Sequence, residues 1–370
     1  MRVLCLEAGP LEKAGAHWFN GVPAWAFETS GVPLPEGPEL AARGVPFHLV
    51  AGWGPDRVVV RDHDLMEVDM TVLGARLRQL ATDHGATLRG GQRVDRSVFD
   101  QYSCTIVDAT GLAGLNLLGL AAVGREDLCA AAQGSWRVTD PQAAVSFFGE
   151  NAVAEGETLC FTGIAGGYSI VNLRLEGKTL SMLTGAIPAR GHPSGTRLAE
   201  RFAREHSWVG ERLRFGARSV PLAPPPACIG RGRLAAIGDC ARQVFGAHGS
   251  GIAQQLLAAR LLARALASGE GPEGYDRRWR RRYGGLLAGA DLFRRFSCTL
   301  DPEQLGTLMA AGAIPESMAR RTLTQRSPRP ERGLLSALFG LARNPPLARR
   351  MLPVLARMPL LEVRYRLGRR

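Results

Sequence analysis

Short apolar runs, separated by glycine, proline and charged residues, characterise the first 125 residues of the chain. Residues 2–9 contain one strand that closes on Glu7, and residues 103–114 contain another that ends at Asp108. Between them, residues 70–84 place apolar side chains at helical spacing. Strands that alternate with a helix in this way predict an α/β domain.

The rest of this first part is less regular. Residues 10–45 are rich in glycine, proline and tryptophan, and we expect a loop with one short helix near 37–43. Residues 47–53 and 57–62 predict an antiparallel pair of strands joined by a tight turn. A short strand near 86–89 follows the predicted helix.

Residues 126–222 change character, because short alternating runs replace the earlier pattern. We predict a helix at 197–205 and a mostly antiparallel sheet, with strands at 129–138, 144–148, 158–164, 167–173 and 180–185. The prolines from Pro221 to Pro226 mark the return to the first domain. From Gly249 onward the pattern is almost wholly helical.

Residues 233–252 combine two features that suit a long, hydroxylated and partly anionic ligand. A short apolar strand ends in Gly238 and Asp239, and a carboxylate at a strand end can accept hydrogen bonds from a polyol. Gly249 and Gly251 then open an apolar helix, where a ligand can approach bare N–H groups. These features fit a flavin dinucleotide. The alternative is an ordinary strand–loop–helix unit with a capping aspartate.

Two further segments extend this pattern. The strand that ends at Asp108 continues as Ala109-Thr110-Gly111, and Glu7 closes the first strand of the chain. In dinucleotide folds an acidic side chain at the end of the second strand binds the adenosine ribose. With these three motifs in this order, the chain resembles the flavoprotein superfamily of geranylgeranyl reductases and aromatic hydroxylases.

The resemblance implies an α/β fold with three parts: a Rossmann-like FAD-binding domain, an inserted, mostly antiparallel β substrate domain and a helical C-terminal region. The boundaries that we expect are 1–125 and 223–270 for the FAD-binding domain, 126–222 for the insert and 271–370 for the helical region. By the same resemblance Glu7 would bind ribose and Asp239 the ribityl chain. The full set of implied FAD contacts is Glu7, Thr110, Gly111, Gly238, Asp239, Gly249, Gly251 and Ile252.

One part of that family pattern is missing. Such proteins begin with a strand, a G-x-G-x-x-G loop that binds the pyrophosphate, and a helix, and only then reach the strand with the acidic residue. Here Met1 directly precedes that strand. One explanation is a true start about 30 residues upstream, which we favour. The other is a variant that has lost tight FAD binding, in the extreme a non-catalytic scaffold.

Within the superfamily the reductase branch is the more similar one. Tyr168 and Gly185 match its pattern in the substrate domain, whereas a Trp and a Phe-Pro pair of that pattern are absent. The resemblance implies C=C reduction of a lipophilic small molecule by hydride transfer through flavin N5, or alternatively monooxygenation. If NAD(P)H is the electron donor, we expect it to bind only transiently, because no nicotinamide-binding motif is visible.

Three residues are candidates for catalysis. His248 lies in the loop beside the predicted flavin site and could exchange a proton near neutral pH, although a loop histidine is more often solvated. His17 lies where the reductases place a cysteine motif, and structural packing with Trp18 is the alternative. Tyr168 could bind a substrate oxygen or could simply pack.

Composition limits the class of protein. The net charge is +12, and residues 271–370 carry all of it, with 20 arginines and no lysine against 8 acidic residues. This basic region could contact an anionic membrane surface, or could be an ordinary solvated face. It contains no nucleic-acid-binding motif, so we expect no nucleic-acid partner. Seven scattered cysteines argue against a disulfide framework and a metal site, and no signal sequence is evident, which predicts a cytoplasmic protein.

Overall fold

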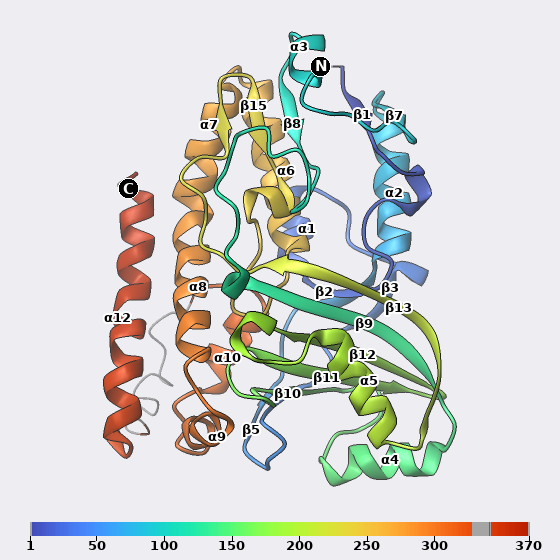
Figure 1. Ribbon diagram of the computed structural model, residues 1–370, viewed down its shortest axis with the longest axis vertical. Helices are drawn as coiled ribbons and strands as arrows, with labels where there is room; N and C mark the ends of the chain where they lie inside the picture. Colours follow the sequence, from blue (N-terminus) through green and yellow to red (C-terminus); the bar gives the residue numbers. More distant parts are fainter. Residues whose placement is uncertain (1, 328–339, 341, 369–370) are drawn as a thin grey trace.

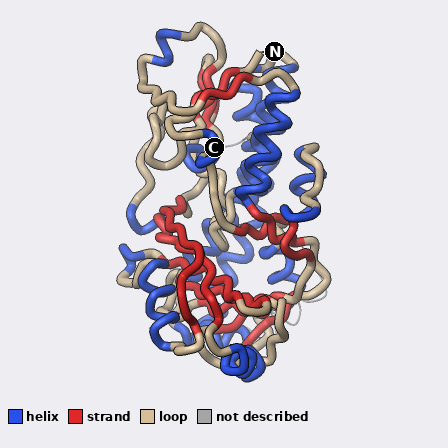
Figure 2. Tube along the Cα trace, turned by 90° about the vertical axis from the view of Figure 1, so that its right-hand side faces the viewer, coloured by secondary structure: helices blue, strands red, loops and turns tan. Residues whose placement is uncertain are grey.

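A seven-stranded sheet forms the centre of the computed structural model, which describes residues 2–327, 340 and 342–368. Its neighbouring strands are antiparallel except for one parallel pair, β10 with β4. Figures 1 and 2 show this sheet in the lower half of the molecule. In spatial order its strands are β13 (Val209–Pro221), β9 (Leu128–Val138), β12 (Thr179–Ala186), β11 (Ser169–Glu176), β10 (Thr158–Thr162), β4 (Phe47–Ala51) and β5 (Arg57–Val60).

Two helices, α4 (Pro141–Glu150) and α5 (Gly195–Glu205), pack their buried residues into the hydrophobic core of this sheet. The strand predicted at 144–148 is therefore wrong. Asp140 caps the N-terminus of α4, because its Oδ1 accepts hydrogen bonds from the backbone N–H groups of Gln142 and Ala143, each at 3.0 Å. The apolar residues at 144 and 148 lie one helical turn apart and both are buried.

The predicted hairpin at 47–53 and 57–62 is confirmed as β4 and β5. Its place in the fold is less expected. Strand β4 pairs in parallel with β10, which brings residues from the first part of the chain into the sheet of the predicted insert. The domain boundaries themselves stay predictions.

The loop predicted over 10–45 is wrong in part, because it contains β2 (Phe19–Pro23), α1 (Ala24–Ser30) and β3 (Leu40–Arg43). Strands β2 and β3 flank β6 (Leu65–Asp69) in a small antiparallel sheet. The helix predicted near 37–43 is likewise a single 3-10 turn that continues into β3.

Parallel strands make up the upper part of the molecule in Figure 1. Strand β1 (Leu4–Leu6) pairs with β7 (Thr87–Arg89), and β8 (Ile106–Asp108) pairs with β15 (Leu234–Ala236). Strand β14 (Gly230–Arg231) completes the second of these sheets. Among the described residues, β1 and β8 each pair on one side only. From left to right, Figure 1 shows the order β15, β8, β1 and β7.

The helices of the upper part and of the C-terminal region complete the fold. Helix α2 (Met70–Asp83) confirms the helix predicted at 70–84. In chain order the other helices are α3 (Val98–Gln101), α6 (Ile252–Ala267), α7 (Gly271–Trp279), a π-helical turn (Arg280–Gly284), α8 (Gly285–Ser297), α9 (Pro302–Ala310), α10 (Glu316–Leu323) and α12 (Pro345–Arg366). None of the helices in the described part of the chain is long and apolar enough to cross a membrane.

Candidate functional site

The ends of β8 and β15 bring two of the predicted cofactor segments together. Asp108 lies opposite Ala236 in the parallel pair, and the backbone N–H of Ile237 donates to the Asp108 carbonyl at 2.9 Å. The segments 108–111 and 238–241 therefore leave the same edge of one sheet. Ligands of α/β proteins bind outside the carboxyl ends of parallel strands, which is where both segments lie.

Asp108 shapes the first of these segments. Its buried carboxylate accepts hydrogen bonds from the N–H and hydroxyl of Thr110 at 3.1 and 2.6 Å and from the N–H of Leu117 at 2.9 Å. The Thr110 hydroxyl is therefore held within the loop. Gly111 follows with a φ of 79°, in the left-handed region that glycine adopts most easily.

Two residues that sequence reasoning missed fix the turn at Gly238. The N–H of Gly238, whose φ is 85°, donates to Oε1 of Gln243 at 2.8 Å. The amide nitrogen of Gln243 donates in turn to the hydroxyl of Tyr275 at 2.6 Å, and that hydroxyl donates to the carbonyl of Ala236 at 3.2 Å. Gln243 and Tyr275 are buried, so this chain of hydrogen bonds is shielded from water.

Asp239 follows in the 3-10 helix Gly238–Ala241 and is partly removed from water. Its Oδ1 accepts a hydrogen bond from the Gln255 amide at 3.2 Å. Burial raises the pKa of the Asp239 carboxyl, and the positive charge of Arg218 on β13 opposes part of that rise. Only Oδ1 of this carboxylate accepts a hydrogen bond from a described residue, so Oδ2 could accept one from a ligand hydroxyl. Arg218 is a further residue that the sequence did not reveal.

Arg218 also connects this region to His17. Its guanidinium donates to the carbonyl of Gly15 at 2.8 Å and lies 5.5 Å from the centre of the Trp18 ring. His17, between these two, is exposed, and its Nε2 donates to the carbonyl of Lys13 at 2.9 Å. Arg218 therefore anchors the loop that carries His17, and its positive charge also acts on Asp239.

Gly249 and Tyr168 lie close together. A Cβ atom at Gly249, whose φ is 78°, would lie 3.0 Å from the Tyr168 hydroxyl and in contact with Leu222 and Val220. Tyr168 is 7% exposed, and its hydroxyl makes no hydrogen bond to any described residue. Burial raises the pKa of Tyr168 well above its ordinary value, and Arg294 offsets part of this rise. Tyr168 is therefore a neutral hydroxyl in an apolar wall.

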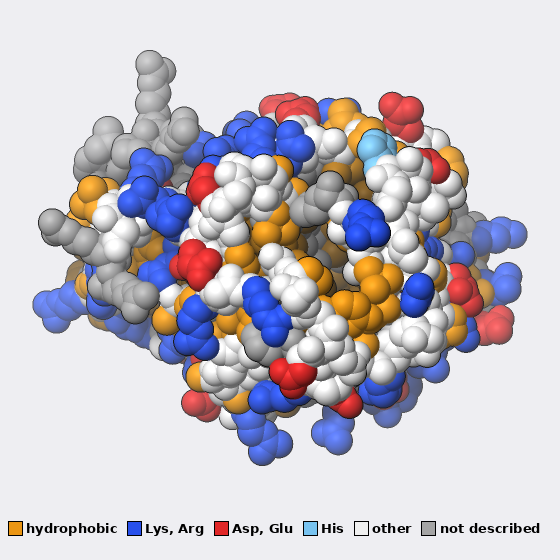
Figure 3. Space-filling model, turned by 90° about the horizontal axis from the view of Figure 1, so that it is seen from above, with side chains coloured by type: hydrophobic (Ala, Val, Ile, Leu, Met, Phe, Trp, Pro, Cys, Tyr) orange, Lys and Arg blue, Asp and Glu red, His pale blue; other side chains and the backbone are white. Residues whose placement is uncertain are grey.

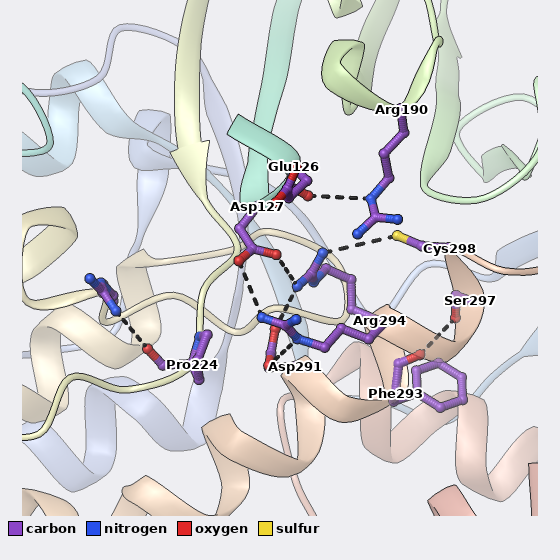
Figure 4. A network of polar contacts seen from close by, with 11 residues as sticks. Glu126, Asp127, Arg190, Pro224, Asp291, Phe293, Arg294, Ser297 and Cys298 are labelled. Atoms are coloured by element: carbon purple, nitrogen blue, oxygen red, sulfur yellow. Dashed lines mark hydrogen bonds and ion pairs between the residues drawn. The ribbon is translucent and has the colours of Figure 1, made fainter. Parts of the chain in front are cut away.

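Arg294 belongs to a buried polar network behind this wall (Figure 4). Its guanidinium contacts the carboxylates of Asp127 and Asp291 at 2.7 and 2.6 Å, and Arg295 contacts the same two carboxylates. Cys298 lies 4.0 Å from Nη1 of Arg294. The network joins the start of β9 to helix α8 and fixes the position of the charge nearest to Tyr168.

The start of α6 lies beside Gly249. Gly251 is its N-cap, Ile252 is its first residue, and no side chain caps it. Its first backbone N–H groups therefore keep their capacity to bind an anionic group. The structure thus places Gly249, Gly251 and Ile252 on one short segment.

His248 is bound at both ring nitrogens. Nε2 is 3.1 Å from the carbonyl of Thr322, which can only accept, so Nε2 carries the proton. Nδ1 then accepts from the hydroxyl of Ser250 at 2.9 Å. Burial lowers the pKa of His248 to about 4. His248 is therefore a neutral histidine that links the 245–250 loop to α10.

Glu7 is the predicted site residue that follows a strand of a different sheet from the one that carries Asp108. It follows β1 in the other parallel sheet, and its Oε1 accepts a hydrogen bond from the N–H of Gly9 at 2.9 Å. The chain does contain one G-x-G-x-x-G spacing, formed by Gly269, Gly271 and Gly274. It begins in the turn after α6 and continues into the first residues of α7 rather than following a strand, so it lacks the strand–loop–helix geometry that binds a pyrophosphate.

The end of the molecule that carries β1 and β8 is hollowed near its centre, and hydrophobic side chains line the hollow (Figure 3).

The comparisons with known proteins are informative for structure alone, since no family model and no curated protein matches the sequence. A geranylgeranyl bacteriochlorophyll reductase-like protein from Thermoplasma acidophilum superposes with a TM-score of 0.69 at 14% identity, over 95% of this chain and 98% of its own. The chain shares its fold.

Two flavin-dependent halogenating enzymes are also similar in structure. The brominase Bmp2 gives a TM-score of 0.61 at 14% identity, over 94% of each chain. A variant of the halogenase PltM in complex with FAD gives 0.62 at 13% identity, over 88% of this chain and 77% of its own. The predicted fold class, an α/β flavoprotein-like fold with C-terminal helices, is thereby confirmed.

Proposed function

We propose that the chain binds FAD between the ends of β8 and β15, the 238–251 segment and Arg218, and acts as a flavin-dependent oxidoreductase on a lipophilic small molecule. The observation that carries this proposal is the direct pairing of β8 with β15, which gathers Gly111, Gly238 and Asp239 at one sheet edge. The shared fold supports it, since the similar proteins include flavin-dependent enzymes and a complex with FAD.

The residues present fit the flavin ring and ribityl chain of FAD better than its adenosine end. Asp239 has an unused carboxylate oxygen for the ribityl hydroxyls, and the uncapped start of α6 suits the anionic edge of a reduced flavin ring. At the other end Glu7 could accept from the adenosine ribose.

Bound FAD supplies hydride transfer at flavin N5, and the chain's residues orient the reactants. Tyr168 would donate a hydrogen bond to a substrate or flavin oxygen, because its hydroxyl is neutral and has no described partner. Val220, Leu222 and Val244 form an apolar wall around it that suits a lipophilic substrate. These features favour C=C reduction of such a substrate.

Monooxygenation or halogenation is the second candidate, because the proteins of similar structure include the flavin-dependent brominase Bmp2 and the halogenase PltM in complex with FAD. A non-catalytic scaffold that does not bind FAD is the third. Cytoplasmic localisation and transient use of NAD(P)H stay predictions.

A titration with FAD tests the proposal. We expect FAD fluorescence to be quenched on binding, and the Asp239→Ala variant to bind FAD at least about tenfold more weakly, since a charge-assisted hydrogen bond contributes about 1.5–3 kcal/mol. Asp83→Ala, which removes an exposed carboxylate on α2, is the matched control and should bind like wild type. A folded, colourless protein that FAD does not bind would exclude the flavoenzyme and favour the scaffold.

Anaerobic assays then separate the two reactions. A reductase reduces a lipophilic alkene without oxygen once its flavin is reduced, whereas a monooxygenase or halogenase consumes oxygen in proportion to product. Turnover that requires oxygen would contradict C=C reduction and leave FAD binding intact.

A further inference from the structure

Helix α12 presents an apolar stripe to solvent. At 100° per residue, Leu352, Ala356, Leu360, Val363 and Leu367 fall within an arc of about 80°. The four large side chains of this stripe are 41%, 66%, 53% and 62% exposed, from Leu352 to Leu367. The opposite face of the helix packs on α8, with Met351 buried (Figure 1). The packing against the protein therefore leaves this stripe uncovered by any described residue.

A row of arginines borders the stripe. Arg350, Arg357 and Arg364 recur every seven residues, which places them along one side of α12. Arg350 donates to the carbonyl of Thr299 at 2.6 Å. Arg357 and Arg364 make no ion pair or hydrogen bond with any residue that the structure describes. Within the described part of the chain, these two positive charges beside the exposed apolar side chains have no ion-pair partner.

A cavity opens beside this row. It has a volume of about 430 Å³ and lies between α12, α8 and the proline-rich crossing at 224–227. Its walls are mostly apolar, with Leu292 and Leu361 among them, while Arg280, Arg357 and Arg364 contribute its positive charge. The single acidic residue of the lining, Asp291, is already paired with Arg294 and Arg295.

We propose that α12 docks this protein onto the surface of an anionic phospholipid bilayer, with a lipid headgroup phosphate in the cavity between α8 and α12. An apolar stripe with arginines along its flank is the arrangement of a helix that lies in the membrane interface. Arginine binds phosphate through paired N–H donors, and the apolar cavity walls suit the start of an acyl chain. The basic excess of residues 271–370 adds long-range attraction to the same surface.

Vesicle co-sedimentation tests this docking independently of any flavin chemistry. We expect the chain to sediment with vesicles of equal parts phosphatidylglycerol and phosphatidylcholine, and to stay in the supernatant with phosphatidylcholine alone. Added salt should release it, because the attraction is screened. Equal binding to both kinds of vesicle, or binding to neither, would overturn the proposal.

Two sets of substitutions locate the surface. The pair R357Q/R364Q should lower the partition coefficient about tenfold or more, since each basic residue near an anionic leaflet contributes about 1 kcal/mol. The triple variant L360S/V363S/L367S should lower it as well, by removing the inserted side chains. The pair R197Q/R204Q on α5 removes the same charge from a distant helix and should bind like wild type (Figure 1).

Three other results would count against docking at α12. The first is an equal loss of vesicle binding in the R197Q/R204Q variant, which would show that net charge alone determines the binding. The second is binding of soluble dihexanoyl phosphatidylglycerol without any binding to vesicles, which would leave a small-molecule site only. The third is retention on a DNA duplex by a protein that vesicles do not bind. Far-ultraviolet circular dichroism of each variant checks that α12 remains folded.

Discussion

Both ring nitrogens of His248 are engaged in hydrogen bonds within the protein. Its ring bridges Ser250 and the carbonyl of Thr322, and only the neutral form can accept at Nδ1 while donating at Nε2. Protonation would place a charge in a site that is partly removed from water, and this desolvation lowers the pKa of His248 to about 4. The loop that carries Gly249 is therefore tied to α10 by an uncharged histidine.

This contact makes stability depend on pH. Because the folded pKa lies below the ordinary value of 6.5, the contribution of His248 is complete above pH 6.5 and is lost as the pH falls towards 4. Between pH 6.5 and 5 we expect the lowered pKa of His248 to decrease the free energy of unfolding by about 2 kcal/mol. Denaturant titrations of wild type and His248→Gln at both pH values measure this.

His63 and His192 also have pKa values that burial lowers, so they add to the loss in wild type with the same sign. The difference between wild type and the variant isolates His248. If His248→Gln loses as much stability as wild type over this interval, the assignment of a neutral, buried ring is wrong.

At the same scale, local motifs predicted only part of the candidate site. Gly111, Gly238 and Asp239 stand next to strand ends, so the sequence reveals them. Gln243 lies in the same loop, five residues after Gly238, whereas Arg218 and Tyr275 lie on a distant strand and a helix that only the tertiary fold brings to this turn. No local spacing marks such residues.

At the scale of elements, prediction succeeded where one pattern decided the structure. Helix α2 has a clear apolar face, and β8 and β15 are short apolar runs. Helix α4 was misread because its apolar residues also suit a strand, and the cap at Asp140 decides otherwise. Strand β13 was missed because its outer positions carry charge, and its pairing with β9 makes it a strand.

Close approach of two helices gives a test at this scale. A Cβ atom at Gly285 on α8 would lie 2.5 Å from the Cα of Glu362 on α12, whereas one at Gly289 would meet Met358 at an ordinary 3.7 Å. We expect Gly285→Ala to push α12 away and cost about 1–3 kcal/mol. Gly289→Ala should be neutral or stabilise the helix by up to about 1 kcal/mol.

Thermal unfolding and amide hydrogen exchange of α12 measure both variants. Exchange should quicken along α12 in Gly285→Ala and stay unchanged in Gly289→Ala. If the two variants behave alike, the helices are not packed as closely as described.

At the scale of the whole molecule, the parallel strands form two small sheets rather than one. Strands β1 and β8 each present an edge that no described strand covers, and Leu4 and Val107 on these edges are 40% and 39% exposed. Parallel sheets are normally covered on both faces and closed by neighbours. Open apolar edges of this kind pair readily with other chains.

We therefore expect the purified chain to associate at high concentration. Leu4→Lys and Val107→Lys together should lower that association, because lysine on an edge strand opposes pairing. Val145→Lys, at an exposed position of α4, is the control. Sedimentation velocity over a wide concentration range measures the effect. A sedimentation coefficient that stays constant with concentration in wild type would contradict it.

The parallel pairing of β4 with β10 has a consequence for anyone who exchanges parts between proteins of this fold. A fragment cut at residue 126 would leave behind the hairpin that covers one flank of β10, and its core would be open there. A working chimera would have to carry residues 47–60 together with 126–222, although sixty-five residues separate them along the chain. Selection on the seven-stranded sheet therefore acts on two stretches of the gene at once.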